Sequence, residues 1–416
     1  MIYLGYSQVE VNKENTIREL GIISGSLLAL LLYLWFERVS LYRKTRKIPL
    51  RICVTGTRGK SGVTRLLASC LSQAGICVLA KTTGSKPVFI LQNGEEKLIK
   101  RRGLPSILEE KKVVRRAVSS SVQALVVELM SFSPESLCVE NRRMLRPHVL
   151  VITNVRMDHI AQAGKSRDEI AESFARSIPD ASTVFVPEEE CFPVFQAIAE
   201  KRKARLVKVG TDSSTDEKSF MKNLSKSEFI QNIRLVLAVC DFLDIKREIS
   251  YSGIMKAVPD KGSLKFWKAE FTLPKRRWDL VSAFSANDPK STRDVIDKLK
   301  KSKKIKGSRW IGLFNIRKDR GDRTHQWMAA FKSRLFPEFQ KIIFVGDQSE
   351  LLKRKMERNI KDQEYESFRN MNAKQIMSRV LEKEKNNCVL VGLGNIGGIG
   401  IELLDHWDTI GIRHDL

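Results

Sequence analysis

Short apolar runs rich in β-branched residues alternate with stretches of helical period over the first half of the chain. The runs are RICVTG (51–56), ICVLA (76–80), ALVVEL (124–129), VLVIT (149–153) and STVFVP (182–187). Strands of a parallel sheet are continuous apolar runs of this kind, because helices cover both faces of the sheet and both faces must be apolar. The pattern predicts an α/β domain with a mostly parallel sheet over residues 49–250.

A second set of strands follows a break in this pattern. A long helix is expected at about 225–243, and the segment 246–267 then mixes glycine, Pro259 and scattered charge, which is typical of a domain joint. Further strands are expected at the following positions: 278–285, 309–316, 341–347 and 388–395. We therefore predict a smaller, Rossmann-like α/β domain over residues 265–416.

One apolar segment is too long for an ordinary strand. Residues 20–36, LGIISGSLLALLLYLWF, contain no charge, and apolar character continues to about residue 41. This length suits a transmembrane helix within an N-terminal segment of residues 1–48, with a buried core helix as the alternative. Basic residues follow the segment, whereas the basic residues before it are balanced by glutamates. By the positive-inside rule, we expect a single pass through the cell membrane, with the long C-terminal part in the cytoplasm.

The first strand runs into a glycine-rich turn and a helix, VTGTRGKSGVTRLL at 54–67. Val54 stands where Walker A has its first glycine, so the motif is the shorter G-T-x-G-K-S, formed by Gly56, Thr57, Gly59, Lys60 and Ser61. Backbone N–H groups at the start of a helix bind phosphate, a lysine adds positive charge, and a serine hydroxyl can bind Mg²⁺. The stretch predicts a nucleotide phosphate site.

Candidate metal ligands stand at the ends of the neighbouring strands. Glu128 closes ALVVEL, and Asp158 and His159 follow VLVIT in the stretch TNVRMDHI. Sites in parallel sheets form at the carboxyl ends of strands, and a carboxylate after four apolar residues is costly without a partner. Taken singly, Glu128 fits a salt bridge and His159 an ordinary loop histidine; taken with the phosphate loop, both indicate a metal site.

Charge and cysteine content indicate the kind of partner and the cellular compartment to expect. The chain has 73 basic and 48 acidic residues, a net charge of +25, which favours an anionic partner such as nucleic acid, a membrane surface or a polyanionic substrate. No nucleic-acid-binding motif is present and aromatic residues are only 7%, so we expect no nucleic-acid partner. Seven cysteines without a C-x-x-C pair indicate buried thiols in a reducing compartment.

Four motifs in order resemble the Mur ligase and folylpolyglutamate synthase superfamily: VTGTRGKS, VVELMSFSPES, VITNVRMDHI and NIRLVLAVCDFLDI. Within it, the N-terminal span and the stretches AKTTGSKP, FSANDPKST, FNIRKDRGDRT and GLGNIGGIG look most like the ligase subunit of poly-γ-glutamate synthase, the PgsB/CapB family. The resemblance covers about residues 20–416. It implies a Mur-ligase-like P-loop ATPase domain followed by the Rossmann-like domain.

The resemblance also implies a chemistry. Such ligases use ATP and Mg²⁺ to convert a carboxylate into an acyl phosphate, which an amine attacks to form an amide; here glutamate would be polymerised through its γ-carboxylate. Carried over, residues 56–63, including Gly62 and Val63, cradle the phosphates, and Ser61, Glu128 and His159 bind metal. Lys60, Glu128 and His159 are the expected catalytic residues. The expected nucleotide contacts outside the loop are Asn232, Asn287, Arg317 and Asp319.

The partners implied by the resemblance are glutamate, the growing polyglutamate chain, the membrane and integral-membrane subunits resembling PgsC/CapC and PgsA/CapA; assembly of several copies is compatible with it. Two departures from the Mur pattern matter. Ala283 replaces the aspartate that opens a D-Y-A-H-N-P motif, with Asp288 nearby, and Arg176 stands in the helix where several Mur enzymes carry a modified lysine. We therefore expect no carbamoylated lysine.

Three alternatives remain open. Another amino-acid ligase of the Mur or folylpolyglutamate type would share the motifs, and a membrane-tethered P-loop ATPase without ligase activity would share the loop. The C-terminal GLGNIGGIG matches the dinucleotide pattern G-x-G-x-x-G, but the chain ends nineteen residues after Gly397, before a second strand with an acidic residue can follow. A tight turn at a domain or partner interface is the expectation for this loop.

Overall fold

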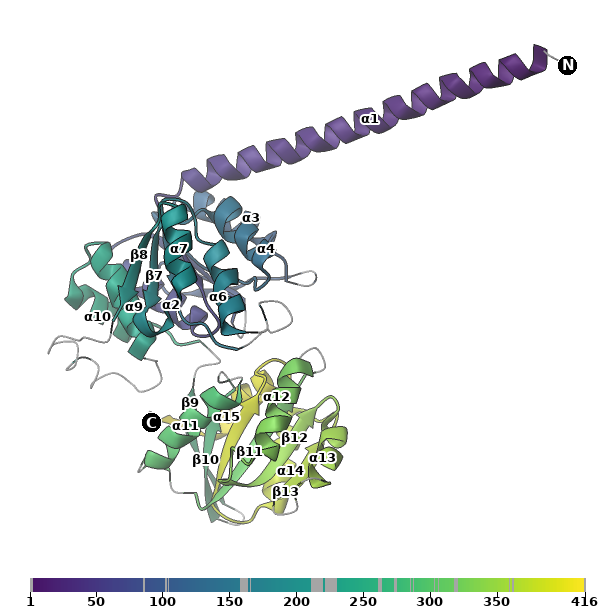
Figure 1. Ribbon diagram of the computed structural model, residues 1–416. Coiled ribbons are helices and arrows are strands. Elements are labelled where there is room, and N and C mark those ends of the chain that lie inside the picture. Colours follow the sequence, from purple (N-terminus) through teal and green to yellow (C-terminus); the bar gives the residue numbers. More distant parts are fainter. Residues whose placement is uncertain are drawn as a thin grey trace.

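The computed structural model contains two α/β units and one long helix, α1 (Tyr3–Arg46), that projects from the first unit (Figure 1). The structure describes the backbone of residues 3–414 outside a set of positions: 85–86, 102, 104, 158–163, 165, 211–219, 221–229, 261–263, 273–274, 285, 287, 303, 306, 318–320, 359 and 361–362. Side chains are described over the same residues except 3–14, 17, 322 and 323.

The first unit is built on a mostly parallel sheet. In the described part of the chain the sheet has eight strands in the order β4-β3-β2-β5-β1-β6-β7-β8, with β3 and β4 antiparallel at one edge. The strands are β1 (Leu50–Thr55), β2 (Val78–Thr82), β3 (Val88–Ile90), β4 (Glu96–Leu98), β5 (Ala124–Glu128), β6 (Val149–Ile152), β7 (Thr183–Pro187) and β8 (Arg205–Val209). The central strands are buried end to end, as their apolar runs predict.

Helices cover both faces of this sheet and enclose two apolar clusters. They are α2 (Lys60–Gln73), α3 (Glu109–Ser119), α4 (Pro134–Cys138), the π-helix η1 (Val139–Leu145), α6 (Arg167–Arg176), the short η2 (Glu188–Glu190), α7 (Pro193–Lys201), α9 (Ile230–Phe242) and α10 (Arg247–Lys256). α10 packs closely on α2, since a Cβ at Gly253 would lie 2.5 Å from the Cα of Cys70. α10 extends to Lys256, beyond the expected domain boundary at residue 250.

The second unit has its own sheet and core. Among the described residues its order is β13-β12-β11-β14-β10-β9-β15, and β9 is antiparallel to both of its neighbours while the other pairs are parallel. Its strands are β9 (Lys265–Thr272), β10 (Lys275–Ser282), β11 (Arg309–Ile316), β12 (Phe339–Gly346), β13 (Glu364–Phe368), β14 (Cys388–Gly394) and β15 (Ile412–His414). Its helices are α11 (Pro289–Lys301), α12 (Gly321–Lys332), α13 (Ser349–Glu357), α14 (Ala373–Lys383) and α15 (Ile399–Ile410).

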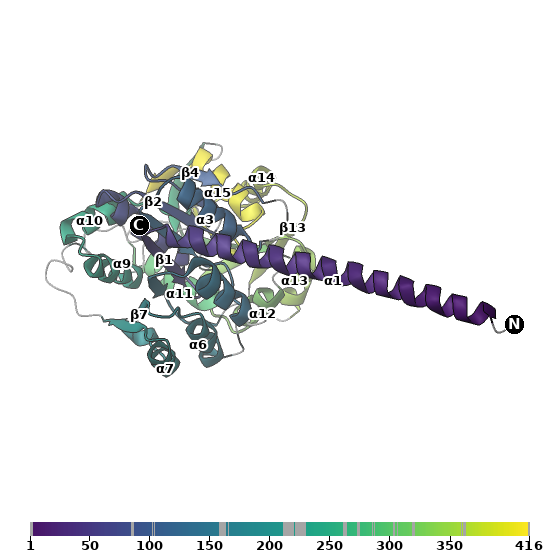
Figure 2. The ribbon, with the colours of Figure 1, turned by 90° about the horizontal axis from the view of Figure 1, so that it is seen from above.

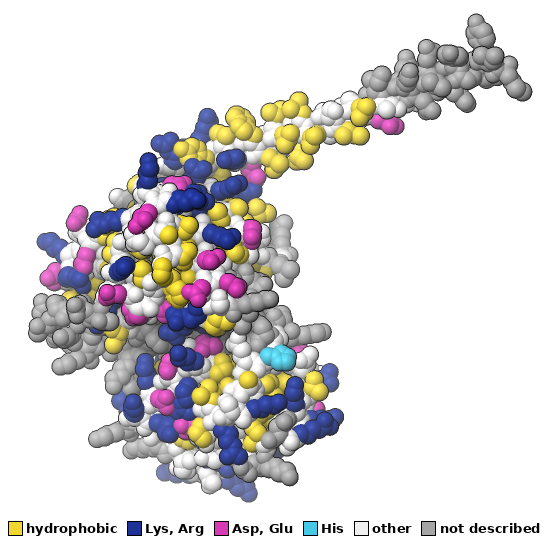
Figure 3. All heavy atoms as spheres, viewed as in Figure 1, with side chains coloured by type: hydrophobic (Ala, Val, Ile, Leu, Met, Phe, Trp, Pro, Cys, Tyr) yellow, Lys and Arg dark blue, Asp and Glu magenta, His cyan; other side chains and the backbone are white. Residues whose placement is uncertain are grey.

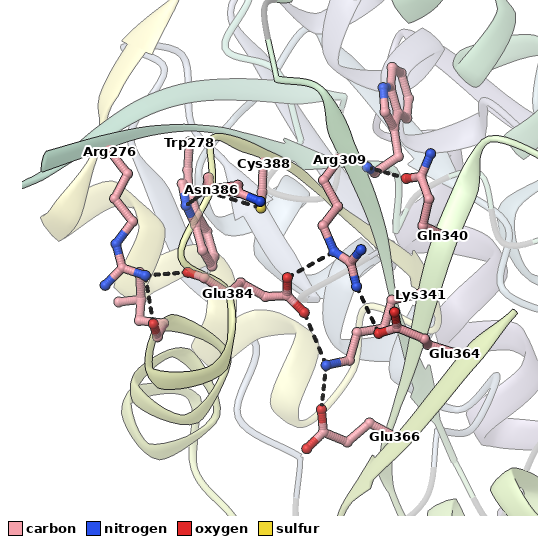
Figure 4. A network of polar contacts seen from close by, with 12 residues as sticks. Arg276, Trp278, Arg309, Gln340, Lys341, Glu364, Glu366, Glu384, Asn386 and Cys388 are labelled. Carbon is pink, nitrogen blue, oxygen red and sulfur yellow. Dashed lines mark hydrogen bonds and ion pairs between the residues drawn. The ribbon is translucent and has the colours of Figure 1, made fainter. Parts of the chain in front are cut away.

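An ionic network holds the amino ends of the parallel strands in the second sheet (Figure 4). Arg309 Nη2 lies 2.7 Å from Glu364 Oε2, and Lys341 Nζ bridges Glu366 Oε2 at 2.8 Å and Glu384 Oε1 at 3.0 Å. These residues stand at or near the starts of β11, β12 and β13 and at the end of α14. The network therefore stabilises the edge opposite to the one where strands deliver site residues.

α1 is long and apolar enough to cross a membrane, and the side chains of its apolar stretch are exposed in the structure. Figure 2 shows it extending well past the rest of the chain. Its C-terminal end is fixed to the first unit: Thr45 Oγ1 donates to the Met144 carbonyl at 3.1 Å, and Ile48 is buried. By length and composition alone this finding fits the expected transmembrane helix.

The predicted fold class is confirmed by this architecture. The predicted strands of the first unit are present within one or two residues, and the helix predicted at about 225–243 is observed from Ile230 to Phe242, with 221–229 outside the described residues. Strands β3, β4 and β8 of the first unit and β9, β13 and β15 of the second unit were not expected. β9 begins at the end of the segment interpreted as a joint and pairs with β10 along its whole length, Lys265 opposite Ser282 and Thr272 opposite Lys275.

Candidate active site

The glycine-rich loop forms a tight turn between β1 and α2. Gly56 has φ +123° and Gly59, which precedes the first residue of α2, has φ +79°, conformations that favour glycine. A Cβ at Gly56 would lie 2.2 Å from Thr153 Oγ1. The turn leaves the first N–H groups of α2 pointing out of the helix end, where an anion binds.

The segment that follows β6 holds the loop in place. Thr57 N donates to the Asn154 carbonyl at 3.1 Å, and Arg58 N donates to Asn154 Oδ1 at 3.0 Å. Asn154 Nδ2 donates back to the Arg58 carbonyl at 3.1 Å. The loop backbone is thus fixed by a neighbouring strand end, so a bound phosphate would meet a preformed cradle.

Lys60 occupies the mouth of the loop. Its Nζ donates to the Gly56 carbonyl at 2.7 Å and lies 4.3 Å from the centre of the Phe132 ring. The side chain is 8% exposed. A cation that contacts the Gly56 carbonyl and an aromatic face at this position is well placed to bind phosphate oxygens.

Ser61 and Glu128 meet at the carboxyl edge of the sheet. β1 and β5 are parallel neighbours with Val54 opposite Glu128, and Ser61 Oγ donates to Glu128 Oε2 at 2.8 Å. The same oxygen accepts from Thr83 N, at the end of β2, at 2.7 Å. A Cβ at Gly84 would lie only 2.4 Å from Ser61 Oγ, so backbone closes this side of the pair.

The pair fits a magnesium ion. Mg²⁺ is typically held by one or two protein oxygens together with substrate phosphates and water, and a hydroxyl and a buried carboxylate lie next to the phosphate loop here. No group of three or more His, Cys, Asp or Glu side chains suited to a metal occurs among the described residues. Asp158 and His159, the other predicted ligands, lie outside the described residues, so His159 stays a prediction.

The other loop residues and Asn232 lie at the same place. Gly62 and Val63 form the first turn of α2, and Val63 N donates to the Gly59 carbonyl at 3.0 Å. Asn232, buried in α9, lies against the loop, because a Cβ at Gly59 would come within 2.8 Å of its amide atoms. The structure therefore brings Asn232 to the phosphate loop; its contact with adenine stays a prediction.

In the second unit, Arg317 follows β11 and lies beside the glycine-rich C-terminal loop. A Cβ at Gly397 would lie 2.3 Å from Arg317 Nη1. Asn315 Nδ2 binds the carbonyls of Asn395 and Gly397 at 2.5 and 2.9 Å, so the loop is a packed turn at the end of β14. Asn287 and Asp319, the remaining predicted nucleotide contacts, lie outside the described residues.

Contacts between the two units reach the phosphate loop. Arg58 Nη2 lies 3.5 Å from Asp288 Oδ2, and Arg156 Nη1 donates to Ser291 Oγ at 3.4 Å. Asp288 is the N-cap of α11, where it accepts from Ser291 N at 2.9 Å. The motif alone gave no role to Arg58 and did not identify Arg156 or Ser291. Asp288 before Pro289 was the available signal, because an aspartate before a proline begins many helices.

Sequence comparison agrees with this arrangement of two units. The Mur ligase middle domain family matches residues 54–255, and the family of the C-terminal domain of poly-γ-glutamate synthase CapB matches residues 270–410. PGA synthase CapB of Bacillus subtilis (strain 168) is 31% identical over 368 residues, covering 86% of this chain and 90% of the relative. The chain belongs to the CapB family. Capsule biosynthesis protein CapB of Bacillus anthracis is 29% identical over 402 residues, 96% of this chain and 85% of the relative.

Solved structures of proteins with low sequence identity resemble this CapB family member in fold alone. The bifunctional folylpolyglutamate synthase/dihydrofolate synthase of Yersinia pestis, complexed with AMPPNP and Mn, has a TM-score of 0.66 at 13% identity, covering 92% of this chain and 97% of that one. FolC of E. coli in complex with ADP has a TM-score of 0.64 at 18% identity, with coverages of 92% and 98%. Both share the two-unit α/β architecture.

Proposed function

We propose that the chain is an ATP-dependent ligase that joins glutamate units through their γ-carboxylates, as its CapB relatives' names indicate for them. The observation that carries this is family membership over nearly the whole chain, combined with Lys60, Ser61 and Glu128 gathered at one phosphate loop. The product class is an amide and the coproducts are ADP and phosphate.

The reaction has two steps. An oxygen of the acceptor γ-carboxylate attacks the γ-phosphorus of ATP, ADP leaves, and an acyl phosphate forms. The amine of the next glutamate, after losing its proton, then attacks the acyl carbon, and phosphate leaves with one oxygen from the original carboxylate. Both partners of the first step are anionic, so positioning and neutralisation of charge are the main requirement.

The residues of the loop meet that requirement in the proposed mechanism. The N–H groups at the start of α2 orient the phosphates and Lys60 Nζ neutralises their charge. A magnesium ion would be bound by Ser61 and Glu128, with His159 as a further proposed ligand, and would polarise the transferred phosphoryl group. Asn232, Asn287, Arg317 and Asp319 are proposed nucleotide contacts, the last three from the second unit.

We also infer that α1 anchors the chain in the cell membrane with both α/β units on the cytoplasmic side. The apolar stretch of α1 and the basic residues after it support this orientation. The family supports a role in polyglutamate synthesis, and integral-membrane subunits like PgsC/CapC and PgsA/CapA are the proposed partners in it.

The direct test is an assay of phosphate release by the full-length chain, purified in detergent together with its membrane partners. We expect release from ATP to require glutamate or polyglutamate, with no stimulation by aspartate, whose side chain is one methylene shorter. Release that ignores every amino acid would favour the tethered ATPase and contradict the ligase. Stimulation by a different amino acid would point to another member of the Mur superfamily.

A further inference from the structure

Three elements with many basic residues meet where α1 leaves the first unit. α1 ends against α3 and η1: Lys111 Nζ of α3 lies 2.6 Å from Glu37 Oε1, and the Arg146 guanidinium, just after η1, lies 4.4 Å from the centre of the Tyr42 ring. We define the basic collar as the exposed residues Arg38, Arg43, Lys47, Lys112, Arg115 and Arg143. Within the described part of the chain, none of the six forms an ion pair.

The acidic residues of these elements near the base of α1 are buried or paired with a cation. Glu110 is fully buried and pairs with Lys81, Glu109 pairs with Arg101 at 2.7 Å, and Glu37 is engaged by Lys111. Glu140 is buried and accepts from the backbone N–H groups of Met130 and Ser131, each at 3.1 Å. The surface around the base of α1 therefore presents positive charge with little acidic charge to offset it.

The collar lies directly beside the apolar stretch. Arg38 and Arg43 follow Phe36 by about 3 and 10 Å along the helix axis, and the contact between Lys111 and Glu37 puts Lys112 at the same level. Figure 3 shows Lys and Arg side chains gathered around the base of α1, next to the apolar side chains of the helix. If Phe36 lies at the edge of the hydrocarbon core, Arg38 and Arg43 lie within the lipid headgroup layer or within one Debye length, about 8 Å, of it.

The junction below the collar is rigid. Arg51 Nη1 donates to the carbonyls of Ile48 at 2.6 Å and Thr45 at 3.2 Å, and its Nε donates to the Arg146 carbonyl at 3.0 Å. Arg51 stands near the start of β1, and the phosphate loop follows directly after the last residue of this strand. Any contact that holds the collar therefore also fixes the orientation of the phosphate site.

We propose that the basic collar binds the anionic headgroups of the bilayer that α1 crosses, and so fixes the orientation of the ATP-binding unit relative to the membrane. The proposal rests on the membrane anchor inferred above. The continuity of the collar with a fully exposed apolar helix favours lipid over the polyglutamate chain as its occupant.

Lysine acylation of the full-length chain tests the collar. The chain is reconstituted in nanodiscs of phosphatidylcholine alone, or mixed with phosphatidylglycerol at about two to one, and acylation of each lysine is followed by mass spectrometry. We expect Lys47 and Lys112 to react at least about threefold more slowly in the anionic discs, and about 1 M salt to abolish the difference. Exposed lysines of the second unit, such as Lys301 and Lys385, should react equally in both discs.

Two charge-reversal variants with the same change in charge complete the test. Arg43→Glu/Arg115→Glu/Arg143→Glu keeps both reporter lysines and should lose the protection, whereas Lys301→Glu/Lys374→Glu/Lys385→Glu should keep it. Equal reactivity in the two discs, or protection that survives the first variant, overturns the proposal. Protection by added poly-γ-glutamate in neutral discs, without protection by anionic lipid, would assign the collar to the polymer and also overturn it. The phosphate-release assay runs in detergent, so failure of the collar and failure of the ligase are distinguishable.

Discussion

At the scale of single residues, the phosphate loop is held by groups outside it. Asn154 fixes the backbone of Arg58 from both sides, and Thr83 N and Ser61 Oγ converge on one oxygen of Glu128. Sequence reasoning could predict Lys60, Ser61 and Glu128 because a motif and two strand ends bring them together. It could not assign Arg58, because its partner Asp288 lies in the other unit and 230 positions further along the chain.

Replacing Lys60 by alanine should abolish glutamate-dependent phosphate release, by about 100-fold or more, because the phosphates lose their only lysine within the loop. The midpoint of thermal unfolding should stay within a few degrees, because the contacts of Lys60 with the Gly56 carbonyl and the Phe132 ring are each worth only about 1 kcal/mol. Phosphate release and circular dichroism measured on the same preparation check both. Full activity in this variant would remove the loop from the mechanism.

The pair of Arg58 and Asp288 should couple the two units during turnover. Asp288→Asn keeps an N-cap for α11 but removes the charge, and Arg58→Met removes the cation. We expect their effects on kcat/KM for ATP to be non-additive by about 0.5 kcal/mol or more. Asp297→Asn, an exposed position further along α11, should combine additively with Arg58→Met. Additive effects in both cycles would show that the pair does not couple the two units.

At the scale of elements, a buried ionic cluster ties β2, α3 and η1 together beside the strand that carries Glu128. Lys81 of β2 is fully buried and contacts Glu110 and Glu109 of α3. Glu140 of η1 accepts from the two residues that follow Leu129, so the cluster supports the segment just after Glu128. The sequence did not reveal this cluster, because Lys81 stands in a stretch, AKTTGSKP, that reads as the start of a turn.

Burial raises the pKa of Glu110 to about 8, with Lys81 opposing the shift and Glu140 adding to it; Glu109 is the other charged group facing it. A raised carboxyl pKa contributes stability below the unfolded value, and this contribution is lost as pH rises toward the folded value. We therefore expect Glu110→Gln to gain stability relative to the native chain between about pH 5 and 8, by a few degrees in unfolding midpoint, and to level off above.

Glu109→Gln is the matched control for this prediction. Against the effect of its burial, Arg101 and Lys81 lower the pKa of Glu109, so this carboxyl titrates below the range of pH 5 to 8 in which Glu110 is tested. Its unfolding midpoint should run parallel to that of the native chain from pH 5 to 8. If the unfolding midpoint of Glu110→Gln also ran parallel to that of the native chain, the raised pKa of Glu110 would be contradicted.

At the scale of the whole molecule, the carboxyl ends of strands in the two sheets are brought together at the phosphate loop. α11 begins just after β10 and its N-cap contacts Arg58, while Arg317 follows β11 in the same sheet. Apolar periodicity predicted both sheets, but not how the two units face each other, because periodicity reports only which faces are buried within a unit. β13 escaped prediction because EYESF, at the edge of its sheet, has three polar residues and neither an apolar run nor a regular alternation.

The central claim is that phosphate passes from ATP to a carboxylate before the amide forms. The most direct measurement supplies glutamate or polyglutamate labelled with heavy oxygen in its γ-carboxylates and analyses the released phosphate by mass spectrometry. The account predicts one heavy oxygen in each phosphate formed during glutamate-dependent turnover. Phosphate that carries oxygen from water alone would contradict it.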